Sequence, residues 1–147
     1  MDQRVDPVSR GKPGRKARRW RLGLALCLIV PAAGYLAASW SIGAGVRSIG
    51  DTALRYYPGE SSDRVAALMA LVESEERGIR ERNRAIWALG QLGDPRALPV
   101  LEKHYRGGET EERGELSQYE LKKAVALCKG ATNISALVWR HGAPARR

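Results

Sequence analysis

One uncharged stretch limits what this chain can fold into more than any other feature of its sequence. Residues 22–46, from Leu22 to Val46, contain no Asp, Glu, Lys or Arg. As a helix, a stretch of this length spans about 37 Å, and the hydrocarbon core of a bilayer is about 30 Å thick. The stretch therefore predicts one transmembrane helix. Trp20 and Trp40 are expected at its two ends, because tryptophan is enriched at membrane–water interfaces.

The positive charge of the chain is concentrated before this stretch. Residues 1–21 carry eight Lys or Arg side chains and two Asp, which accounts for six of the nine net positive charges. Basic residues favour the cytoplasmic side of a membrane, so we predict a single-pass protein with a cytoplasmic tail and an extracytoplasmic C-terminal domain. The tail, residues 1–21, is expected to be disordered because it is rich in Gly, Pro and charge.

The partners that the charge pattern favours are lipids rather than nucleic acids. The basic tail adjoins the predicted membrane helix, where it can contact anionic headgroups of the bilayer. Charges after residue 46 are nearly balanced, so no basic stripe is available to follow a phosphate backbone. We therefore expect the lipid bilayer as a partner and no nucleic-acid partner.

The alternative to a permanent anchor is a cleaved signal peptide. Ala37 and Ser39 satisfy the small-x-small pattern for cleavage directly after Ser39. The long tail and the length of the uncharged stretch favour an uncleaved anchor, and both alternatives place the domain outside the cytoplasm. Gly34 and Ala38, then Ser39 and Gly43, are small residues four apart, a spacing that allows membrane helices to associate with a second copy.

Beyond residue 46, the periodicity of apolar residues predicts an all-α domain. Residues 47–60 are expected to form a juxtamembrane connector. Apolar residues then recur at three- and four-residue steps, which indicates a helical repeat domain over residues 61–141 and a disordered tail over residues 142–147. The helices are expected at about 63–73, 78–92, 95–105, 117–129 and 132–140.

Two of these expected helices are similar to each other. Residues 84–90, Arg-Ala-Ile-Trp-Ala-Leu-Gly, align with residues 122–128, Lys-Lys-Ala-Val-Ala-Leu-Cys, which lie 38 positions later. Each is followed by a short turn and another apolar-patterned helix. Helix pairs repeated at this period are typical of an α-solenoid, so the fold class expected is a short α-solenoid after one transmembrane helix.

The physical role of each motif residue between Arg84 and Leu101 can be assigned from its chemistry. Ala85 and Ala88 permit close approach of a neighbouring helix, and Leu89 is expected in the core. Two glycines, Gly90 and Gly93, are expected to permit tight packing and the turn, and Asp94 to cap the next helix.

The same segment resembles a HEAT-like repeat of the bilin-lyase type. It contains spaced alanines, Ala-Leu-Gly, Leu-Gly-Asp-Pro-Arg-Ala and Pro-x-Leu, in the order found in that family. The resemblance implies a surface for a protein partner, as in an interaction or scaffold module. It also leaves open an alternative, a lyase-like enzyme or enzyme subunit related to bilin lyases.

No grouping of residues in the sequence suggests catalysis. The two histidines, His104 and His141, have no Cys, Asp or His companions at metal-ligand spacing. His104 is expected near a helix C-terminus, where a cation is favoured. Cys27 and Cys128 are expected to pack as small hydrophobic residues. We therefore predict no enzyme activity, no cofactor and no metal.

The residues expected to bind a partner lie on and just after the helix at 78–92. Trp87 fits two roles, an inter-helix core residue beside Gly90 or an aromatic residue that faces a partner. Arg80, Arg84 and Arg96 could line the same surface. About two and a half repeats are few for a stable solenoid, so a protein partner or self-association could supply the missing burial.

Overall fold

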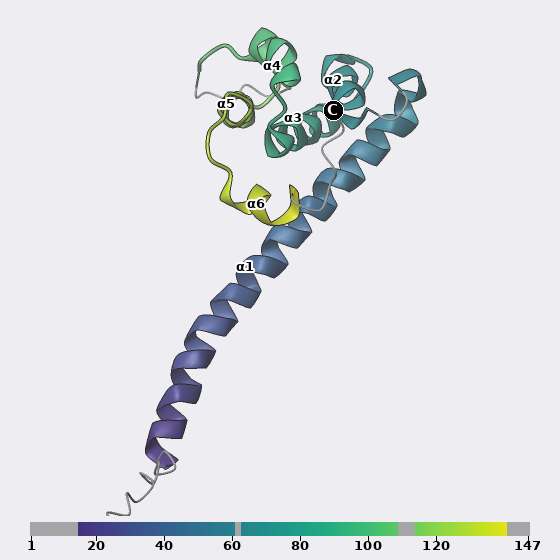
Figure 1. The fold of residues 1–147 in the computed structure, drawn as a ribbon. Coiled ribbons are helices and arrows are strands. Elements are labelled where there is room, and N and C mark those ends of the chain that lie inside the picture. Colours follow the sequence, from purple (N-terminus) through teal and green to yellow (C-terminus); the bar gives the residue numbers. More distant parts are fainter. Residues whose placement is uncertain (1–14, 61–62, 109–113, 141–147) are drawn as a thin grey trace, which may run out of the picture. The chain divides into compact units, whose positions relative to one another are not determined.

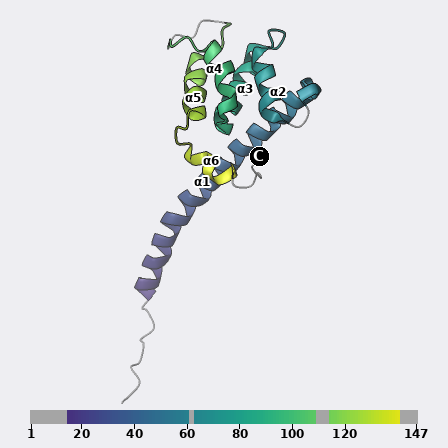
Figure 2. The same ribbon diagram turned by 45° about the horizontal axis from the view of Figure 1, so that its top comes forward.

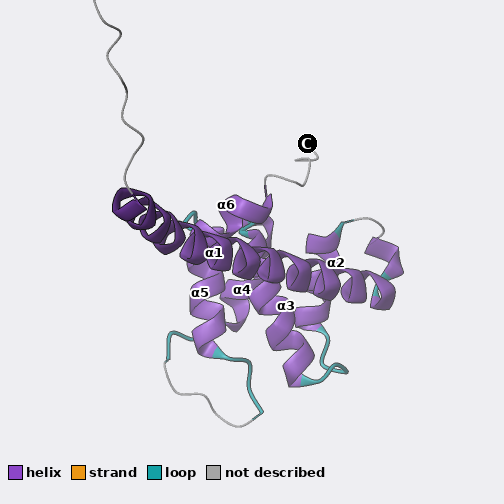
Figure 3. Cartoon of the chain, turned by 90° about the horizontal axis from the view of Figure 1, so that it is seen from below, coloured by secondary structure: helices purple, strands orange, loops and turns teal. Residues whose placement is uncertain are grey.

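The computed structural model describes the backbone of residues 15–60, 63–108 and 114–140, and the side chains in these ranges from residue 26 onward, residue 60 excepted. The described residues form helices and loops without a strand, as Figure 3 shows, and the all-α repeat fold is confirmed. The chain divides into two compact units, residues 1–36 and residues 37–147. The elements are α1 (Arg15–Tyr56), η1 (Pro58–Glu60), α2 (Arg64–Glu73), α3 (Ile79–Leu92), η2 (Pro95–Ala97), α4 (Leu98–His104), α5 (Gln118–Cys128) and α6 (Ile134–Arg140).

The first unit contains the beginning of α1, the long helix in Figure 1. This helix starts at Arg15, so residues 15–21, which were predicted to be disordered, are helical. Lys, Arg and Ala favour helix, and neither Pro nor Gly interrupts the chain between residues 15 and 22. The other residues of the predicted tails, 1–14 and 142–147, lie outside the described residues.

Apolar side chains of the first unit are exposed. Every residue from 26 to 36 is exposed, including Leu28 at 73% and Val30 at 63%. By length and composition, Leu26–Tyr56 could cross a membrane, and no other helix in the described ranges meets that test. A signal sequence or the core helix of a soluble protein can have the same length and composition.

The second half of α1 belongs to the repeat domain. Buried residues follow one face of this helix at three- and four-residue steps: Ser39, Gly43, Val46, Gly50 and Ala53. The predicted connector at 47–60 was therefore wrong for residues 47–56, which are helical and contribute to the core. Pro31 lies in the first half of α1, and the next proline is Pro58. The helix has ended at Tyr57, the residue that precedes Pro58.

The centre of the second unit is α3, which packs between α2 and α5 (Figure 2). Ala85, Ala88 and Leu89 are fully buried, as predicted from the repeat motif. A Cβ atom added to Gly90 would lie 2.8 Å from the Ala124 Cα, so the backbones of α3 and α5 approach closely only because residue 90 is glycine.

The turn and cap expected at Gly93 and Asp94 are confirmed, and the structure adds a cap at Asp63. The Asp63 carboxylate accepts hydrogen bonds from the Val65 and Ala66 amides at the start of α2. At the end of α3, Gly93 adopts a left-handed conformation with φ of 59°, which glycine accommodates without a steric penalty. Asp94 then accepts a hydrogen bond from the Arg96 amide. These local contacts set the angle between successive helices.

The last described helix, α6, packs on α1 and on the end of α3. Trp139 covers Gly43 of α1, where an added Cβ would lie 2.8 Å from the Trp139 Cβ. Asn133 donates to the Gln91 side chain at 2.9 Å, and the Arg140 Nε donates to the Gln91 carbonyl at 3.1 Å. A cation at this position satisfies the last carbonyls of α3 and opposes its dipole.

Candidate partner-binding surface

Three of the four sequence-predicted site residues share one face of α3. Arg80, Arg84 and Trp87 are spaced by four and three residues, and Gln91 continues the series after another four, so all four point to the same side of the helix. Arg80 and Arg84 are exposed, whereas Trp87 and Gln91 are half-buried. We call these four residues the α3 face.

Shallow hollows flank the α3 face on both sides. The hollow toward α1, about 130 Å³ in volume, includes Thr52, Tyr56, Glu81 and Arg84. The hollow toward α5 has a volume of about 80 Å³ and is lined by Trp87, Gly90, Gln91, Glu120, Lys123 and Ala124. The α1 side of this surface was missed from the sequence, because residues 47–60 were expected to be a connector. The signal that could have revealed it is the three- and four-residue spacing of small residues in α1.

Trp87 packs against α1 and also lines one of the hollows. Its ring lies against α1, where a Cβ added to Gly45 would be 3.6 Å from the ring edge. The ring is half-buried, and it also lines the hollow toward α5. The glycine that makes room for it is Gly45 rather than Gly90, whose missing side chain admits Ala124 of α5. The ring is therefore held in place on one side and accessible on the other.

Arg96, the fourth predicted residue, has a structural role elsewhere. Its guanidinium lies 2.7 Å from the Asp94 carboxylate and 2.5 Å from the carboxylate of Asp63, the residue that caps α2. The hydrogen bond from Arg96 lowers the pKa of Asp94. Burial alone would raise the pKa of Asp63, but hydrogen bonds from Arg96 and the Val65 and Ala66 amides outweigh it, and the pKa is lowered. Arg96 thus joins the turn after α3 to the start of α2.

Replacing Arg96 by Gln should make the stability of the protein less sensitive to acid. Because the folded-state pKa values of Asp63 and Asp94 are lowered, these carboxylates stabilise the fold above their ordinary pKa, and this contribution is lost as pH falls through the lowered values. Without Arg96 both pKa values should return toward normal. The loss at neutral pH should be at most about 1 kcal/mol, because the pairs are exposed.

Urea unfolding of the full chain in detergent micelles, compared between neutral pH and about pH 3, measures this effect. Lys129→Gln, which removes another exposed ion pair, Lys129 with Glu102, is the control and should leave the acid dependence unchanged. An Arg96→Gln protein with the same pH dependence as the native chain would contradict the role given to this arginine.

The other reactive side chains fit structural roles. Cys128 is buried and its thiol donates to the Leu89 carbonyl, as expected for a packed residue. Burial raises its pKa to about 11, and a protonated thiol is a poor nucleophile. Cys27 is exposed on α1 rather than packed. In the part of the chain that the structure describes, no three His, Cys, Asp or Glu side chains gather as a metal site would require.

Comparison with known proteins identifies the repeat domain. The family model for HEAT repeats matches residues 43–122, slightly more than half of the chain. No curated protein and no solved structure matches this chain. The matched segment begins within the second half of α1 and ends in α5, which agrees with the burial of Val46 and Ala53. The domain thus begins near residue 43 rather than at residue 61, and the chain belongs to the HEAT-repeat family.

Proposed function

We propose that this protein is a single-pass membrane protein whose HEAT-repeat domain binds a protein partner outside the cytoplasm. The observation that carries the anchor is the exposure of the apolar residues of α1. Burying an exposed Leu or Val side chain is worth roughly 1.5–3 kcal/mol, and the first unit leaves Leu26, Leu28, Ile29, Val30 and Leu36 exposed. A lipid environment would bury all of them.

The burial pattern of α1 favours an uncleaved anchor over the two alternatives. A soluble core helix would have most of its apolar residues buried, whereas those from 26 to 36 are exposed. Cleavage after Ser39 would remove Ser39 itself, which is 1% exposed and lies on the buried face that α1 contributes to the repeat domain. The distribution of Lys and Arg then supports a cytoplasmic N-terminus.

The composition of the α3 face supports protein binding. HEAT repeats generally mediate protein–protein interaction, and Trp and Arg are enriched among the residues that contribute most to interface energy. The two hollows beside this face, about 80 and 130 Å³, are smaller than the roughly 300–1,000 Å³ typical of small-molecule sites. They suit side chains of a partner better than a tetrapyrrole, so we propose a binding module without catalysis.

Cross-linking in intact membranes tests the α3 face. A photoreactive amino acid at position 80 should give a discrete cross-linked product, because Arg80 is exposed at one end of this face. Arg84→Glu should reduce that product at least about tenfold, the size of effect expected when the charge of a central interface arginine is reversed. Arg84 is exposed, so the fold should tolerate this change.

The matched control uses Arg47, an exposed arginine on another side of α1, near Asp51 and Arg55. Arg47→Glu should leave the cross-linked product from position 80 unchanged, and a photoreactive residue at position 47 should give none. Equal loss from both charge reversals, or no product from position 80, would refute binding at the α3 face.

A further inference from the structure

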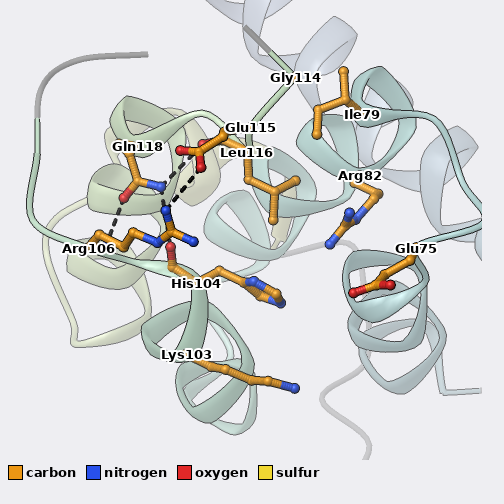
Figure 4. Close-up of a pocket in the computed structure, with 10 residues that line it drawn as sticks. All are labelled: Glu75, Ile79, Arg82, Lys103, His104, Arg106, Gly114, Glu115, Leu116 and Gln118. Carbon is orange, nitrogen blue, oxygen red and sulfur yellow. Dashed lines mark hydrogen bonds and ion pairs between the residues drawn. The ribbon is translucent and has the colours of Figure 1, made fainter. Parts of the chain in front are cut away.

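A polar pocket lies at the end of the repeat domain where α3 begins and α4 ends. Its volume is about 320 Å³, and it is lined by the α2–α3 turn, the start of α3, the end of α4 and the residues that lead into α5. Figure 4 shows its lining: Glu75, Ile79, Arg82, Lys103, His104, Arg106, Gly114, Glu115, Leu116 and Gln118.

Three cationic side chains surround this pocket. The Arg82 Nε donates to the Val72 carbonyl at 2.8 Å, which fixes the guanidinium so that it points toward the His104 ring (Figure 4). Lys103 pairs with Glu73 at 2.8 Å, and Arg106 pairs with Glu115 at 3.0 Å. The remaining carboxylate of the lining is Glu75, in the α2–α3 turn.

Burial and neighbouring charges act together on His104 at the pocket. Its pKa is lowered, first by burial and then by Arg82, Lys103 and Arg106, while Glu73 acts in the opposite direction. The expectation that a helix C-terminus would favour a cation here was therefore wrong, because burial and neighbouring cations outweigh the helix dipole. Burial disfavours any charge, whereas the neighbouring cations disfavour a positive imidazole in particular, and an anion in the pocket would offset only that second effect.

A hydrogen-bonding atom of the His104 ring is buried beside the pocket without a partner. Its Nε2 atom is buried and makes no hydrogen bond to any residue that the structure describes. Most buried polar atoms in proteins have a partner in the protein or in ordered water. The Arg82 guanidinium uses its Nε for the Val72 carbonyl, so its other nitrogens can donate to an oxyanion in the pocket beside the His104 ring.

The wall of the pocket is held in place before any ligand binds. Gln118 is 6% exposed, and its amide nitrogen donates to the His104 and Leu116 carbonyls. Its carbonyl oxygen accepts a hydrogen bond from the Arg106 amide at 2.8 Å. This one side chain therefore joins the end of α4 to the start of α5. A ligand would bind without the cost of ordering these segments.

We propose that this pocket binds the carboxylate of an acidic side chain presented by a protein partner. Its lining is mostly polar and charged, whereas small-molecule sites are mostly apolar. The pocket also lies on a different side of α3 from the α3 face, since Arg82 is about 160° around the helix from Arg80. It is thus a second binding site, which goes beyond the function proposed for the α3 face.

Nuclear magnetic resonance of the full chain in detergent micelles tests this site directly. The probe is the peptide acetyl-Gly-Glu-Gly-amide, and its neutral match is acetyl-Gly-Gln-Gly-amide. The chain has two histidines, so the His104 ring signal can be followed with His141 as the reference. Binding of the Glu peptide should raise the His104 pKa saturably, because a nearby carboxylate stabilises the charged imidazole. The Gln peptide should cause no change.

Two lysines with similar surroundings provide a matched pair of variants. Lys103 lines the pocket and pairs with Glu73, and Lys129 lies outside it and pairs with Glu102 at 2.7 Å. Both side chains are more than half exposed, so neither Gln variant should unfold the protein. Lys103→Gln should weaken binding of the Glu peptide roughly fivefold, and Lys129→Gln should leave it unchanged.

Three outcomes would overturn the proposal. The first is an equal response of His104 to the Glu and Gln peptides, or no response to either. The second is equal weakening by Lys103→Gln and Lys129→Gln, which would show a general charge effect. The third is a response to inorganic phosphate without one to the Glu peptide, which would assign the pocket to a phosphate group. None of these measurements depends on the partner of the α3 face, so the two proposals can fail separately.

Discussion

Aspartate at both Val30 and Ala33 should release the protein from the membrane fraction. Both residues lie in the exposed apolar part of α1, close to the middle of the predicted span. An aspartate near the centre of a membrane helix costs about 2.5–3.5 kcal/mol, so two cost about 5–7 kcal/mol. That cost is a large part of the free energy that the apolar side chains gain when lipid buries them. The measurement is the fraction of protein that stays in the pellet after alkaline carbonate extraction.

The control places the same charges further along the same helix. Arg47 and Arg55 are exposed residues of α1 that follow the apolar part, so Arg47→Asp combined with Arg55→Asp should leave the protein in the pellet.

A reporter that is active only outside the cytoplasm should be active when fused to the C-terminus. Extraction of the native chain by carbonate, or a mature mass that lacks the residues up to Ser39, would contradict an uncleaved anchor. A reporter active only in the cytoplasm would contradict the orientation.

Leu89→Ala should destabilise the repeat domain by about 2–5 kcal/mol, the range for a fully buried leucine in a core that cannot collapse around the cavity. Leu89 is fully buried on α3, which packs between α2 and α5. The close approach of α3 and α5 at Gly90 leaves the neighbouring backbone little freedom to close the gap. Such a loss is a large fraction of the roughly 5–15 kcal/mol that stabilises a typical domain.

Urea unfolding measures this loss as a lower midpoint with an unchanged slope. The matched control is Leu137→Ala, because Leu137 of α6 is 58% exposed and the chemical change is the same. It should change the unfolding free energy by less than about 0.5 kcal/mol. Similar losses in the two variants would show that burial on α3 is not what holds the repeats together.

The α3 face and the polar pocket together suggest how a short repeat array can bind selectively. The α3 face offers Trp87 and two arginines beside small hollows, which suits broad contact with a folded surface. The pocket gathers Arg82, Lys103 and Arg106 on another side of α3, where we propose that one acidic side chain binds. A partner that meets both requirements would be distinguished from one that meets only one.

Only part of the candidate surface could be predicted from the sequence. Arg80, Arg84 and Trp87 were grouped correctly, because residues four and three apart on a helix share one face. Arg96 was misplaced because its partner Asp63 lies 33 residues away along the chain, and no local pattern records that contact. The pocket around His104 was missed for the same reason, since its lining extends from Glu75 to Gln118.

By itself, the sequence determined the local features of this protein. The spacing of apolar residues determined the helices from α2 to α6, and their ends were determined by Asp63, Gly93 and Asp94. The uncharged stretch determined the apolar part of α1. All of these effects act over a few neighbouring residues. Only the tertiary structure decided that α1 continues into the core through Gly50 and Ala53. It also decided that burial and Arg82, which lies 22 residues away along the chain, lower the pKa of His104. Such effects depend on which distant segments pack together, and this packing is fixed only when the whole domain folds.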